Sequence, residues 1–550
     1  MSDPAGEAVR AYHRRTKHQP ERYARSLGYL DWATQPDPYR RFTGAPRLAL
    51  DLCADAGPPR YDALFVPGSV PVRPWDRAAV SELFHASFAL SAWKEVPGSR
   101  WALRVNPSSG NLHPTEAYLL SAPVDGFGAD AMLAHYQPFA HALEVRRRFD
   151  PGLWRTLLGD LPADSALVGL SSIFWRESWK YGERAFRYCQ HDVGHALGAL
   201  AMAAALLGRE ARLLPAPGDA EVALLLGIAG QSGIEAEHPD ALVVLAPVGR
   251  LDQAVVERWR PDAAALERLQ ERPLLGTAAP LSTDHHEWPA IDEVAAAAAK
   301  APGWVRSEPA QPPPLAWPEP DRPLPARALI RGRRSAVAMD GSTGLTRDAF
   351  YGMLARVADP RRPPFHLLPW PPQLHFALFV HRVRDLPSGL YLLVRDPGQG
   401  AALRAALSGR FAWQRPAACP EGLDLVLLEA GDGRAAAASI SCHQAIAADG
   451  AFALAMLARF APALAERGAW FYRALHWEAG MLGQTLYLEA EAAGVRATGI
   501  GCFFDDAMHR LLGLAGEDSQ VLYHFTVGGA LEDDRLRTLP AYAHLGRPVG

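Results

Sequence analysis

The most restrictive feature of this sequence is an internal repeat. Residues 186–208, FRYCQHDVGHALGALAMAAALLG, align with residues 472–494, YRALHWEAGMLGQTLYLEAEAAG, at a constant offset of 286 positions, so that Arg187 matches Arg473. This similarity exceeds what helical periodicity alone gives by chance. Because only two copies are present, we expect a fused pseudo-dimer of related domains and not a solenoid.

The register continues beyond these segments, since Asp219 falls on Asp505 at the same offset. Each half contains a helix, a turn and strand, a long apolar helix and a final strand. This order is typical of an α+β or α/β domain around one sheet. The long helices, predicted over 184–207 and 470–493, are apolar around much of their circumference. We therefore expect them to be buried against each other.

One Pro-rich stretch divides the chain. Residues 308–325, EPAQPPPLAWPEPDRPLP, cannot form a helix or a central strand, so we interpret them as a semi-rigid linker. Before it, STDHHEWPAIDEVAAAAAKA predicts a helix capped by Ser282, Thr283 or Asp284. The expected units are an N-terminal extension (1–60), a first domain (61–275), the helix and linker (276–326) and a second domain (327–550).

Composition excludes several classes of protein. Apolar residues make up 49% of the chain and charged residues 21%, as in soluble globular proteins, and a net charge of −4 provides no basic surface for nucleic acid. No segment has the ~20 apolar residues that span a bilayer, and no signal peptide is indicated. The 5 cysteines form no C-x-x-C pair, which argues against a disulfide framework or a thiolate zinc site. We expect a cytoplasmic protein with no membrane or nucleic-acid partner.

A loop in the first half contains more turn-forming residues than a turn needs. The stretch RVNPSSGNLHPTEAYLL includes Pro107, Ser108, Ser109 and Asn111 directly before an apolar strand. Its hydroxyls, amides and backbone N–H groups suit a flat polar ligand. The alternative is a plain surface loop.

The second half carries two further motifs. RGRRSAVAMDGSTGLTRDAFYGML holds Arg333, Arg334 and Ser335, and ATGIGCFFDD holds Gly499, Ile500 and Gly501. In this order and spacing the three motifs resemble the FMN-dependent nitroreductase superfamily, and more closely its SagB/ThcOx-type dehydrogenase branch. The resemblance covers nearly the whole chain as two tandem domains. It implies two nitroreductase-like domains that form an intramolecular pseudo-dimer with an FMN cofactor.

The residue types agree with that implication. A flavin phosphate needs Arg forks and N–H donors, which Arg333, Arg334 and Ser335 supply. The flavin ring needs small residues so that backbone approaches it, which Gly499 and Gly501 on either side of Ile500 provide. The polar ring edge needs fixed partners, for which the candidates are Ser108, Ser109 and Asn111 beside Pro107. A solvated basic patch is the alternative for the arginines.

The motifs are divided unevenly between the halves. The first half has the Ser-rich loop, but Ala63-Leu64-Phe65 and Leu213-Leu214-Pro215 stand where the other two motifs belong. The second half has those motifs, but LLPWPPQL replaces the loop. In nitroreductases the flavin lies at a dimer interface and the loop comes from the partner subunit. The resemblance therefore implies one composite site and one FMN per chain.

A Lys-Tyr pair follows the same division. Lys180 and Tyr181 stand where the dehydrogenase branch has a pair implicated in proton handling during azoline oxidation, whereas the second half has Glu466 and Arg467. Removal of hydride from carbon requires a group that takes the proton, and such a pair is suitable. An ordinary amphipathic helix start is the alternative.

Other signals favour structural explanations. His191 and His195 have the spacing of a helical zinc site, but no third ligand is evident, so we interpret them as core or interface residues and expect no metal. DHHE at 284–287 suits a helix start. Cys502 lies in the glycine turn near the expected flavin, and nothing indicates an activated thiolate.

The sequence thus predicts an FMN-dependent oxidoreductase that moves a hydride between a substrate carbon and flavin N5. The resemblance implies azoline-to-azole oxidation in a peptide-derived or small-molecule substrate. One alternative is an NAD(P)H-dependent nitro or quinone reductase, and another is a flavin-less scaffold. The aromatic N-terminal extension is expected to wrap the other domain or to shape a substrate pocket. Two pseudo-dimers could further associate into a homodimer.

Overall fold

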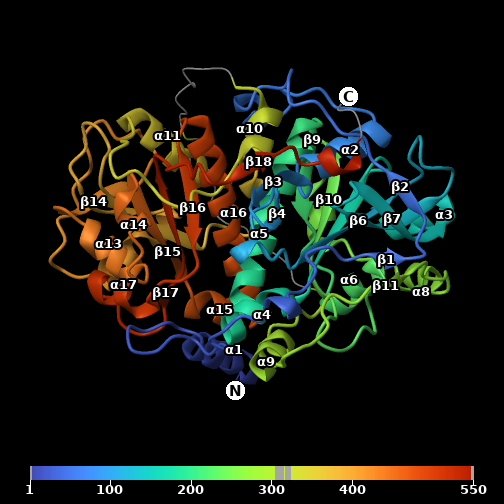
Figure 1. The fold of residues 1–550 in the computed structure, drawn as a ribbon, viewed down its shortest axis with the longest axis horizontal. Coiled ribbons are helices and arrows are strands. Elements are labelled where there is room, and N and C mark those ends of the chain that lie inside the picture. Colours follow the sequence, from blue (N-terminus) through green and yellow to red (C-terminus); the bar gives the residue numbers. More distant parts are fainter. Residues whose placement is uncertain (1–2, 304–314, 316–323, 547–550) are drawn as a thin grey trace.

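The computed structural model describes residues 3–303, 315 and 324–546. Two domains, each with a mixed helix-and-sheet architecture, lie side by side with a pair of long helices between them (Figure 1). Most of the predicted linker, 308–325, lies outside the described residues. Within the described part, no helix combines the length and apolar character needed to cross a membrane.

The first domain is built on a seven-stranded antiparallel sheet with the order β2-β7-β6-β5-β8-β10-β9. Strands β5, β6 and β8 are buried at every residue, and β7 and β9 at all but one, because helices cover both faces of the sheet. The strands are β2 (Arg47–Ala49), β5 (Thr115–Ser121), β6 (Ala131–Gln137), β7 (Ala142–Phe149), β8 (Ala166–Ser172), β9 (Arg209–Leu213) and β10 (His238–Pro247). Strand β2 comes from the segment assigned to the N-terminal extension and forms one edge of this sheet.

The second domain repeats this order without the β2 edge. Its six-stranded antiparallel sheet runs β14-β13-β12-β15-β17-β16. The strands are β12 (Leu374–Val380), β13 (Gly389–Leu393), β14 (Leu425–Ala430), β15 (Phe452–Arg459), β16 (Arg496–Ile500) and β17 (Ser519–Gly528). Position by position, β12 to β17 stand where β5 to β10 stand in the first domain, which confirms the predicted tandem architecture.

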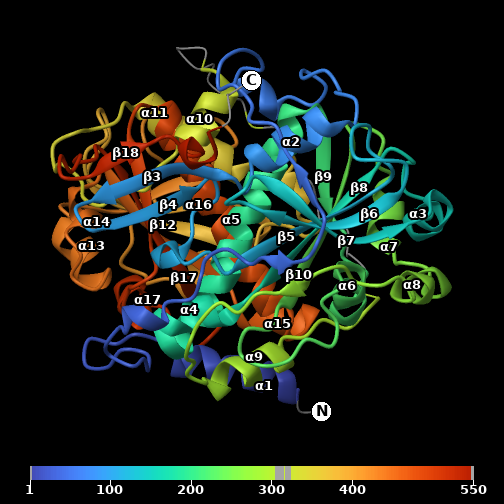
Figure 2. The same ribbon diagram turned by 45° about the vertical axis from the view of Figure 1, so that its right-hand side comes forward.

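The two long helices form the centre of the molecule (Figure 2). Helix α5 (Ala185–Leu206) is buried at every residue, and α16 (Phe471–Ala492) is buried from its start to Ala490. Both agree with the predicted ranges to within one residue. They cross where Gly194 meets Gly480: a Cβ on either glycine would overlap the backbone of the opposite helix. Only glycine permits so close a crossing.

The contacts around this crossing obey a pseudo-two-fold symmetry. Arg187 donates to Asp505 at 2.7 Å, and Arg473 donates to Asp219 at 2.8 Å. These four residues are equivalent in pairs at the offset of the sequence repeat. Reciprocal contacts of one patch with its own copy define an isologous interface. The predicted intramolecular pseudo-dimer is therefore confirmed.

Each domain also extends a terminal segment over the other. Helix α1 (Pro4–Arg15) packs against the second domain, where His13 contacts the Tyr472 hydroxyl and the Gln520 amide, each at 3.2 Å. At the other end, β18 (Arg537–Leu539) pairs with β3 (Leu90–Val96) of the first domain. Strand β3 forms a hairpin with β4 (Ser99–Arg104) that lies across the central helices in Figure 2.

The helix before the linker begins later than expected. Helix α9 (Pro289–Ala297) has Pro289 at its first position and Trp288 as N-cap, without a side-chain cap. The predicted cap at Ser282, Thr283 or Asp284 is therefore wrong. Proline needs no capping partner because it has no N–H, and Ser282 instead accepts from Trp175 Nε1 at 2.9 Å.

The remaining elements cover the sheets and their edges. They are α2 (Arg77–His85), α3 (Pro151–Leu158), α4 (Phe174–Tyr181), α6 (Asp219–Leu226), α7 (Gln253–Arg258), α8 (Ala263–Gln270), α10 (Ala326–Gly332), α11 (Arg347–Ala358), α12 (Gly400–Ala406), α13 (Arg434–Ile440), α14 (Ile446–Asp449), α15 (Ala461–Arg467), α17 (Asp505–Leu512) and the short pair β1 (Phe42–Thr43) and β11 (Thr277–Ala278).

Candidate functional site

A cavity of about 700 Å³ lies where the two domains meet, a size typical of small-molecule and cofactor sites. Both domains and the N-terminal segment line it. Of the residues singled out in the sequence, it brings together Pro107, Ser108, Ser109, Asn111, Lys180, Tyr181, Arg333, Ser335, Gly499, Ile500 and Gly501. Arg334 lines a smaller adjoining cavity of about 270 Å³ instead. Motifs from opposite halves of the chain thus converge on one place.

The Ser-rich loop is held in shape by its own side chains. Asn111 donates to the Ala102 carbonyl at 2.9 Å, and its Oδ1 lies 2.9 Å from His113 Nε2. The backbone N–H of His113 donates to Ser108 Oγ at 2.8 Å. Gly110, Asn111 and His113 all have positive φ angles, so the loop bends sharply. Both polar ends of Asn111 therefore stabilise the loop itself.

Two buried carboxyl groups support this loop from below. Ser109 N–H donates to Asp192 Oδ1 at 3.1 Å, and Ser108 Oγ donates to Glu177 Oε1 at 3.4 Å. The second oxygen of each carboxyl group has no hydrogen-bond partner among the described residues. Burial raises the pKa of Asp192 to about 7. Burial and the neighbouring Asp192 charge raise the pKa of Glu177 well above its usual range.

Lys180 and Tyr181 end helix α4 directly over the loop. A Cβ on Gly110 would lie 2.6 Å from the Tyr181 hydroxyl and 3.1 Å from Lys180 Nζ. The ammonium group lies 5.3 Å from the centre of the Tyr181 ring. Burial and the Glu177 charge raise the pKa of Tyr181, so its hydroxyl stays protonated near neutral pH. Tyr181 is thus a proton donor in this state.

Arg333 joins the two domains at the cavity wall. Its Nε donates to the Val105 carbonyl at 3.0 Å and its Nη2 to the Arg104 carbonyl at 3.1 Å. The remaining nitrogen, Nη1, faces Ser335 Oγ at 3.5 Å, and Ser335 Oγ donates to the Tyr487 hydroxyl at 2.9 Å. One face of the guanidinium therefore orders the start of the loop, while the other is directed to the cavity.

Arg334 is oriented differently from its neighbour. Its Nη1 donates to the carbonyls of Arg331 and Arg333, both at 2.7 Å, and its Nη2 to that of Ser91 at 2.8 Å. Burial and repulsion by Arg333 lower the pKa of Arg334 to about 10. Two adjacent, largely buried guanidinium groups favour a bound anion nearby.

The glycines of the 499–501 turn make room for tyrosines of this chain. A Cβ on Gly499 would overlap the Tyr523 hydroxyl, and one on Gly501 would lie 2.7 Å from Tyr188 Cε1. The Tyr188 hydroxyl donates to the Gly501 carbonyl at 3.1 Å. The sequence predicts small residues here for the approach of a flat ring, and the two tyrosines are a second reason for them.

The two histidines spaced four apart are interface residues, as predicted. The His191 ring stacks on Tyr523 with a centroid distance of 4.3 Å. His195 Nε2 contacts the Tyr523 hydroxyl at 3.2 Å, and burial lowers the pKa of His195 to about 3. Among the described residues, no group of three or more His, Cys, Asp or Glu side chains is arranged to hold a metal ion.

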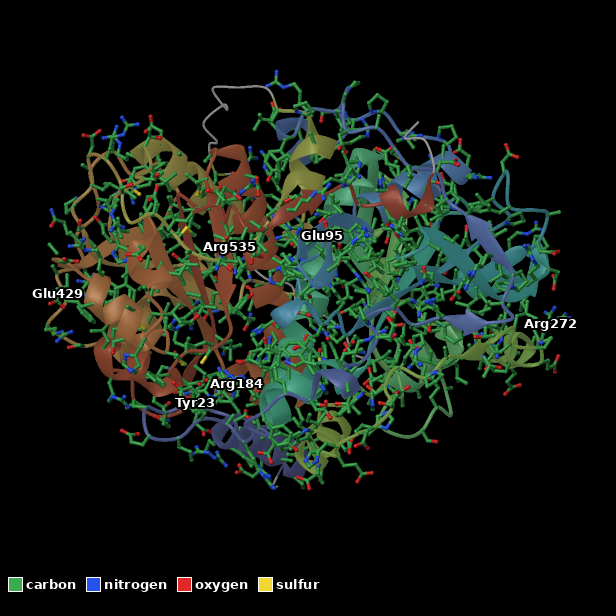
Figure 3. All side chains as sticks on the ribbon, in the orientation of Figure 1. Tyr23, Glu95, Arg184, Arg272, Glu429 and Arg535 are labelled. Carbon is green, nitrogen blue, oxygen red and sulfur yellow. The ribbon has the colours of Figure 1, made fainter. Side chains whose placement is uncertain are left out.

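The structure adds residues that sequence reasoning missed. His18, Tyr23 and Arg184 line the cavity, so the N-terminal segment both contacts the second domain and closes one side of the site. Figure 3 labels Tyr23 and Arg184, which lie close together in this view, below the centre of the molecule. The sequence does give one indication of Asp192, because a carboxylate in an apolar, buried helix is costly unless it has a partner or a function.

Several residues that line the cavity have a buried polar atom without a hydrogen-bond partner in the described part of the chain. Arg104 Nε, His113 Nδ1, Asp192 Oδ2 and His195 Nδ1 are buried without a hydrogen-bond partner among the described residues. Each belongs to a residue that lines the cavity. Buried polar groups are normally satisfied, so this wall is suited to a ligand that offers both donors and acceptors.

The fold is similar to that of known nitroreductases. Residues 419–529 match the model of the Nitroreductase family. A putative nitroreductase from Anabaena variabilis is 22% identical, and the match covers 95% of this chain and 99% of that one with a TM-score of 0.67. At this identity the likeness shows a shared fold that extends over both domains. A search of curated proteins found no match.

Two further structures match smaller parts of the chain. One is the E. coli microcin synthetase McbBCD complex with truncated pro-MccB17 bound, at 19% identity, 45% coverage of this chain, 95% of that chain and a TM-score of 0.27. The other is a putative nitroreductase from Ralstonia eutropha, at 16% identity, 41% and 97% coverage and a TM-score of 0.28.

Proposed function

We propose that the chain is an FMN-dependent oxidoreductase with one flavin site, located in the cavity between the two domains. The observation that carries this proposal is the convergence of the motifs: the loop and the Lys-Tyr pair come from the first domain, and Arg333, Ser335 and residues 499–501 come from the second. The nitroreductase match and fold support an oxidoreductase of this class.

The residues present fit FMN. A flavin ring carries donors and acceptors along one edge, as the unsatisfied atoms Arg104 Nε, His113 Nδ1 and Asp192 Oδ2 require. Ser108, Ser109 and the 499–501 turn would hold the ring. Arg333, Arg334 and Ser335 would hold the phosphate, with Arg334 acting from the adjoining cavity. When bound, FMN supplies hydride transfer at N5.

The protein's own part is to hold and move protons beside the ring. Tyr181 keeps its hydroxyl proton near neutral pH, and Lys180 lies next to it. Asp192, with a pKa of about 7, changes its protonation in the range where a general acid or base is most effective. A proton released when a substrate C–H bond is oxidised therefore has an acceptor at the cavity wall.

The substrate class is a finer part of the proposal. By resemblance to the SagB/ThcOx-type branch, the substrate is an azoline ring in a peptide-derived or small molecule, which is oxidised to an azole. An NAD(P)H-dependent nitro or quinone reductase would use the same cavity. Rapid bleaching of the flavin by NADPH alone would favour the reductase, and bleaching by an azoline-containing peptide would favour the dehydrogenase.

The decisive measurement is the visible absorption spectrum of the purified full chain, with the released flavin identified and counted. We expect one FMN per chain. Two per chain would mean that the mirror-related position also binds flavin. None, even after addition of FMN, would overturn the proposal in favour of a flavin-less scaffold.

A further inference from the structure

Two cysteines from separate loops meet at the cavity. Cys442 lies between α13 and α14, and Cys502 follows β16; their Sγ atoms are 2.8 Å apart. Both are free thiols in this structure. A disulfide bond is about 2.05 Å long, so joining the two sulfurs requires a movement of less than about 1 Å.

The Gln444 side chain and the local backbone conformation hold the two cysteines in place. Gln444 Nε2 donates to the Cys502 carbonyl at 2.9 Å and to the Ser441 carbonyl at 2.8 Å, which ties one loop to the other. Cys442 and His443 have φ angles of 54° and 59°. Two successive non-glycine residues in this region are strained, and such strain persists where the surrounding structure enforces it. The approach of the sulfurs is therefore built into the fold.

The two thiols are not equivalent. Cys502 is one of the residues that line the cavity, whereas Cys442 is not, although both side chains are partly exposed. The Cys442 thiol lowers the pKa of Cys502, and the positive Arg184 guanidinium, which donates to the Gly501 carbonyl at 3.3 Å, adds to this effect. A thiolate is the nucleophilic form of cysteine. Cys502, which faces the cavity and has the lowered pKa, is thus the attacking group, and Cys442 is placed to resolve what Cys502 forms.

We propose that Cys442 and Cys502 form a redox-active dithiol that reduces low-molecular-weight disulfides at the cavity mouth. The Cys502 thiolate attacks one sulfur of the small disulfide, which forms a mixed disulfide and releases one thiolate. The Cys442 sulfur then attacks Cys502 Sγ, closes the Cys442–Cys502 disulfide and releases the second small thiolate. Two electrons pass from the pair to the small disulfide, and the two cysteine protons end on the released thiols.

This site is specific to one side of the pseudo-dimer. At the offset of the repeat, the counterpart of Cys502 is Ala216, so the mirror-related position has no attacking thiol. The pair also differs from the other cysteines. Cys189 is fully buried in α5, and Cys53 and Cys419 have no second sulfur beside them among the described residues.

The test uses the full chain equilibrated in mixtures of reduced and oxidised glutathione, followed by alkylation of free thiols and peptide mass spectrometry. We expect a Cys442–Cys502 disulfide that increases with the oxidised fraction and is reversed by excess reduced glutathione. Alkylation of Cys502 should be faster than that of Cys419, because the pKa of Cys502 is lowered by Cys442 and Arg184 whereas burial raises the pKa of Cys419.

Two single variants separate the roles. In Cys442→Ser, Cys502 should be trapped as a mixed disulfide with glutathione; in Cys502→Ser, Cys442 should remain unmodified. Cys419→Ser is the control and should leave the pair unchanged. Equal modification in the first two variants, or a pair that stays reduced while Cys53 and Cys419 carry glutathione, would overturn the proposal. Thermal melting of each variant excludes unfolding as the cause.

The flavin count of the same samples keeps this proposal separate from the proposed function. A disulfide that forms in a protein unable to bind FMN supports the dithiol and removes the flavin assignment. A protein with one FMN and an inert cysteine pair supports the flavin assignment and removes the dithiol.

Discussion

The two mirror-related sides of this pseudo-dimer are built from the same elements, but their equivalent side chains have different partners. On the cavity side, Asp192 of α5 accepts the N–H of Ser109 and leaves its second oxygen unpaired. At the equivalent position of α16, Glu478 accepts the N–H of Gln373 at 3.1 Å and forms a buried ion pair with Arg395. On one side, the same helix position thus holds a buried carboxyl group with one oxygen unpaired among the described residues; on the other, it holds a fully paired structural carboxyl group.

The segment that follows α9 packs against the first domain on the mirror-related side. The backbone N–H of Lys300 donates to Asp219 at 2.9 Å, and Lys300 Nζ donates to the Pro217 carbonyl at 2.7 Å. A Cβ on Gly218 would lie 2.8 Å from Pro302. The segment after α9 therefore packs just beyond the counterpart of the glycine turn. The N-terminal segment takes the equivalent place on the cavity side, where the backbone N–H of His18 donates to Asp505 at 2.9 Å.

The Lys-Tyr pair shows the same contrast. Lys180 and Tyr181 face the loop, whereas their counterpart Glu466 is exposed and forms a surface ion pair with Arg459 at 2.7 Å. Surface ion pairs contribute little to stability. The fold therefore depends on the two-fold arrangement of the domains, whereas the reactive groups are needed on only one side.

The largest expected effect is that substitutions of Asp192 and Glu478 change the free energy of unfolding in opposite directions. Glu478→Gln leaves Arg395 buried without its charge partner and should destabilise the protein by about 3–5 kcal/mol. Asp192→Asn removes a carboxyl group that is costly to ionise and should stabilise the protein at pH 8. Chemical denaturation of both variants measures this contrast, which would be broken if both changes destabilised alike.

The sign for Asp192 follows from its raised pKa. Between pH 4 and 7 the unfolded chain ionises this carboxyl group while the folded chain keeps it protonated, so the contribution of Asp192 to stability decreases as pH rises to about 7 and then levels off. Asp192→Asn should lose this slope of unfolding free energy against pH. An unchanged slope would show that Asp192 is not the group responsible.

The next effect concerns the proton-handling pair. Tyr181→Phe should lower turnover about 10²-fold, the lower end for general acid–base catalysis, with little change in flavin content. Glu466→Ala on the mirror side should leave turnover unchanged because it removes only a surface ion pair. Both are measured with the substrate that reduces the wild-type flavin. Equal rates for Tyr181→Phe and wild type would remove the assigned role.

A smaller effect tests the two-fold axis itself. Gly194→Ala introduces a Cβ that overlaps the Trp477 carbonyl of the facing helix, and overpacking of this kind costs about 1–3 kcal/mol. Gly409→Ala is the matched control, since nothing lies within 4 Å of its Cβ position. Thermal melting should separate the two variants; coincident melting curves would mean that the helices separate easily at this point.

The smallest expected effect is on cofactor affinity. Arg334→Ala should weaken FMN binding about tenfold, in keeping with ~1.5 kcal/mol for one hydrogen bond to a charged group. Arg434→Ala removes an exposed guanidinium paired with Asp432 and should have no effect. Flavin fluorescence titration gives both affinities. No change for Arg334→Ala would leave phosphate binding to Arg333 alone.

The prediction from sequence was most successful where the signal was periodic or repeated. The ranges 184–207 and 470–493 agree with α5 and α16 to within one residue, because long apolar helices have strong local signals. The cap of α9 was misplaced because several polar residues precede Pro289, and local propensity does not decide among them.

The two-fold architecture of this protein follows from its sequence alone, because a repeat at constant offset specifies two similar domains. The glycines and charged residues of the repeat then form reciprocal contacts. The tertiary structure alone decided which side chains are reactive. The carboxyl groups of Glu177 and Asp192, and the thiols of Cys442 and Cys502, come together from different elements, and their pKa values depend on burial and neighbours. Burial and proximity are properties of the packed chain, so no local pattern of residues encodes them.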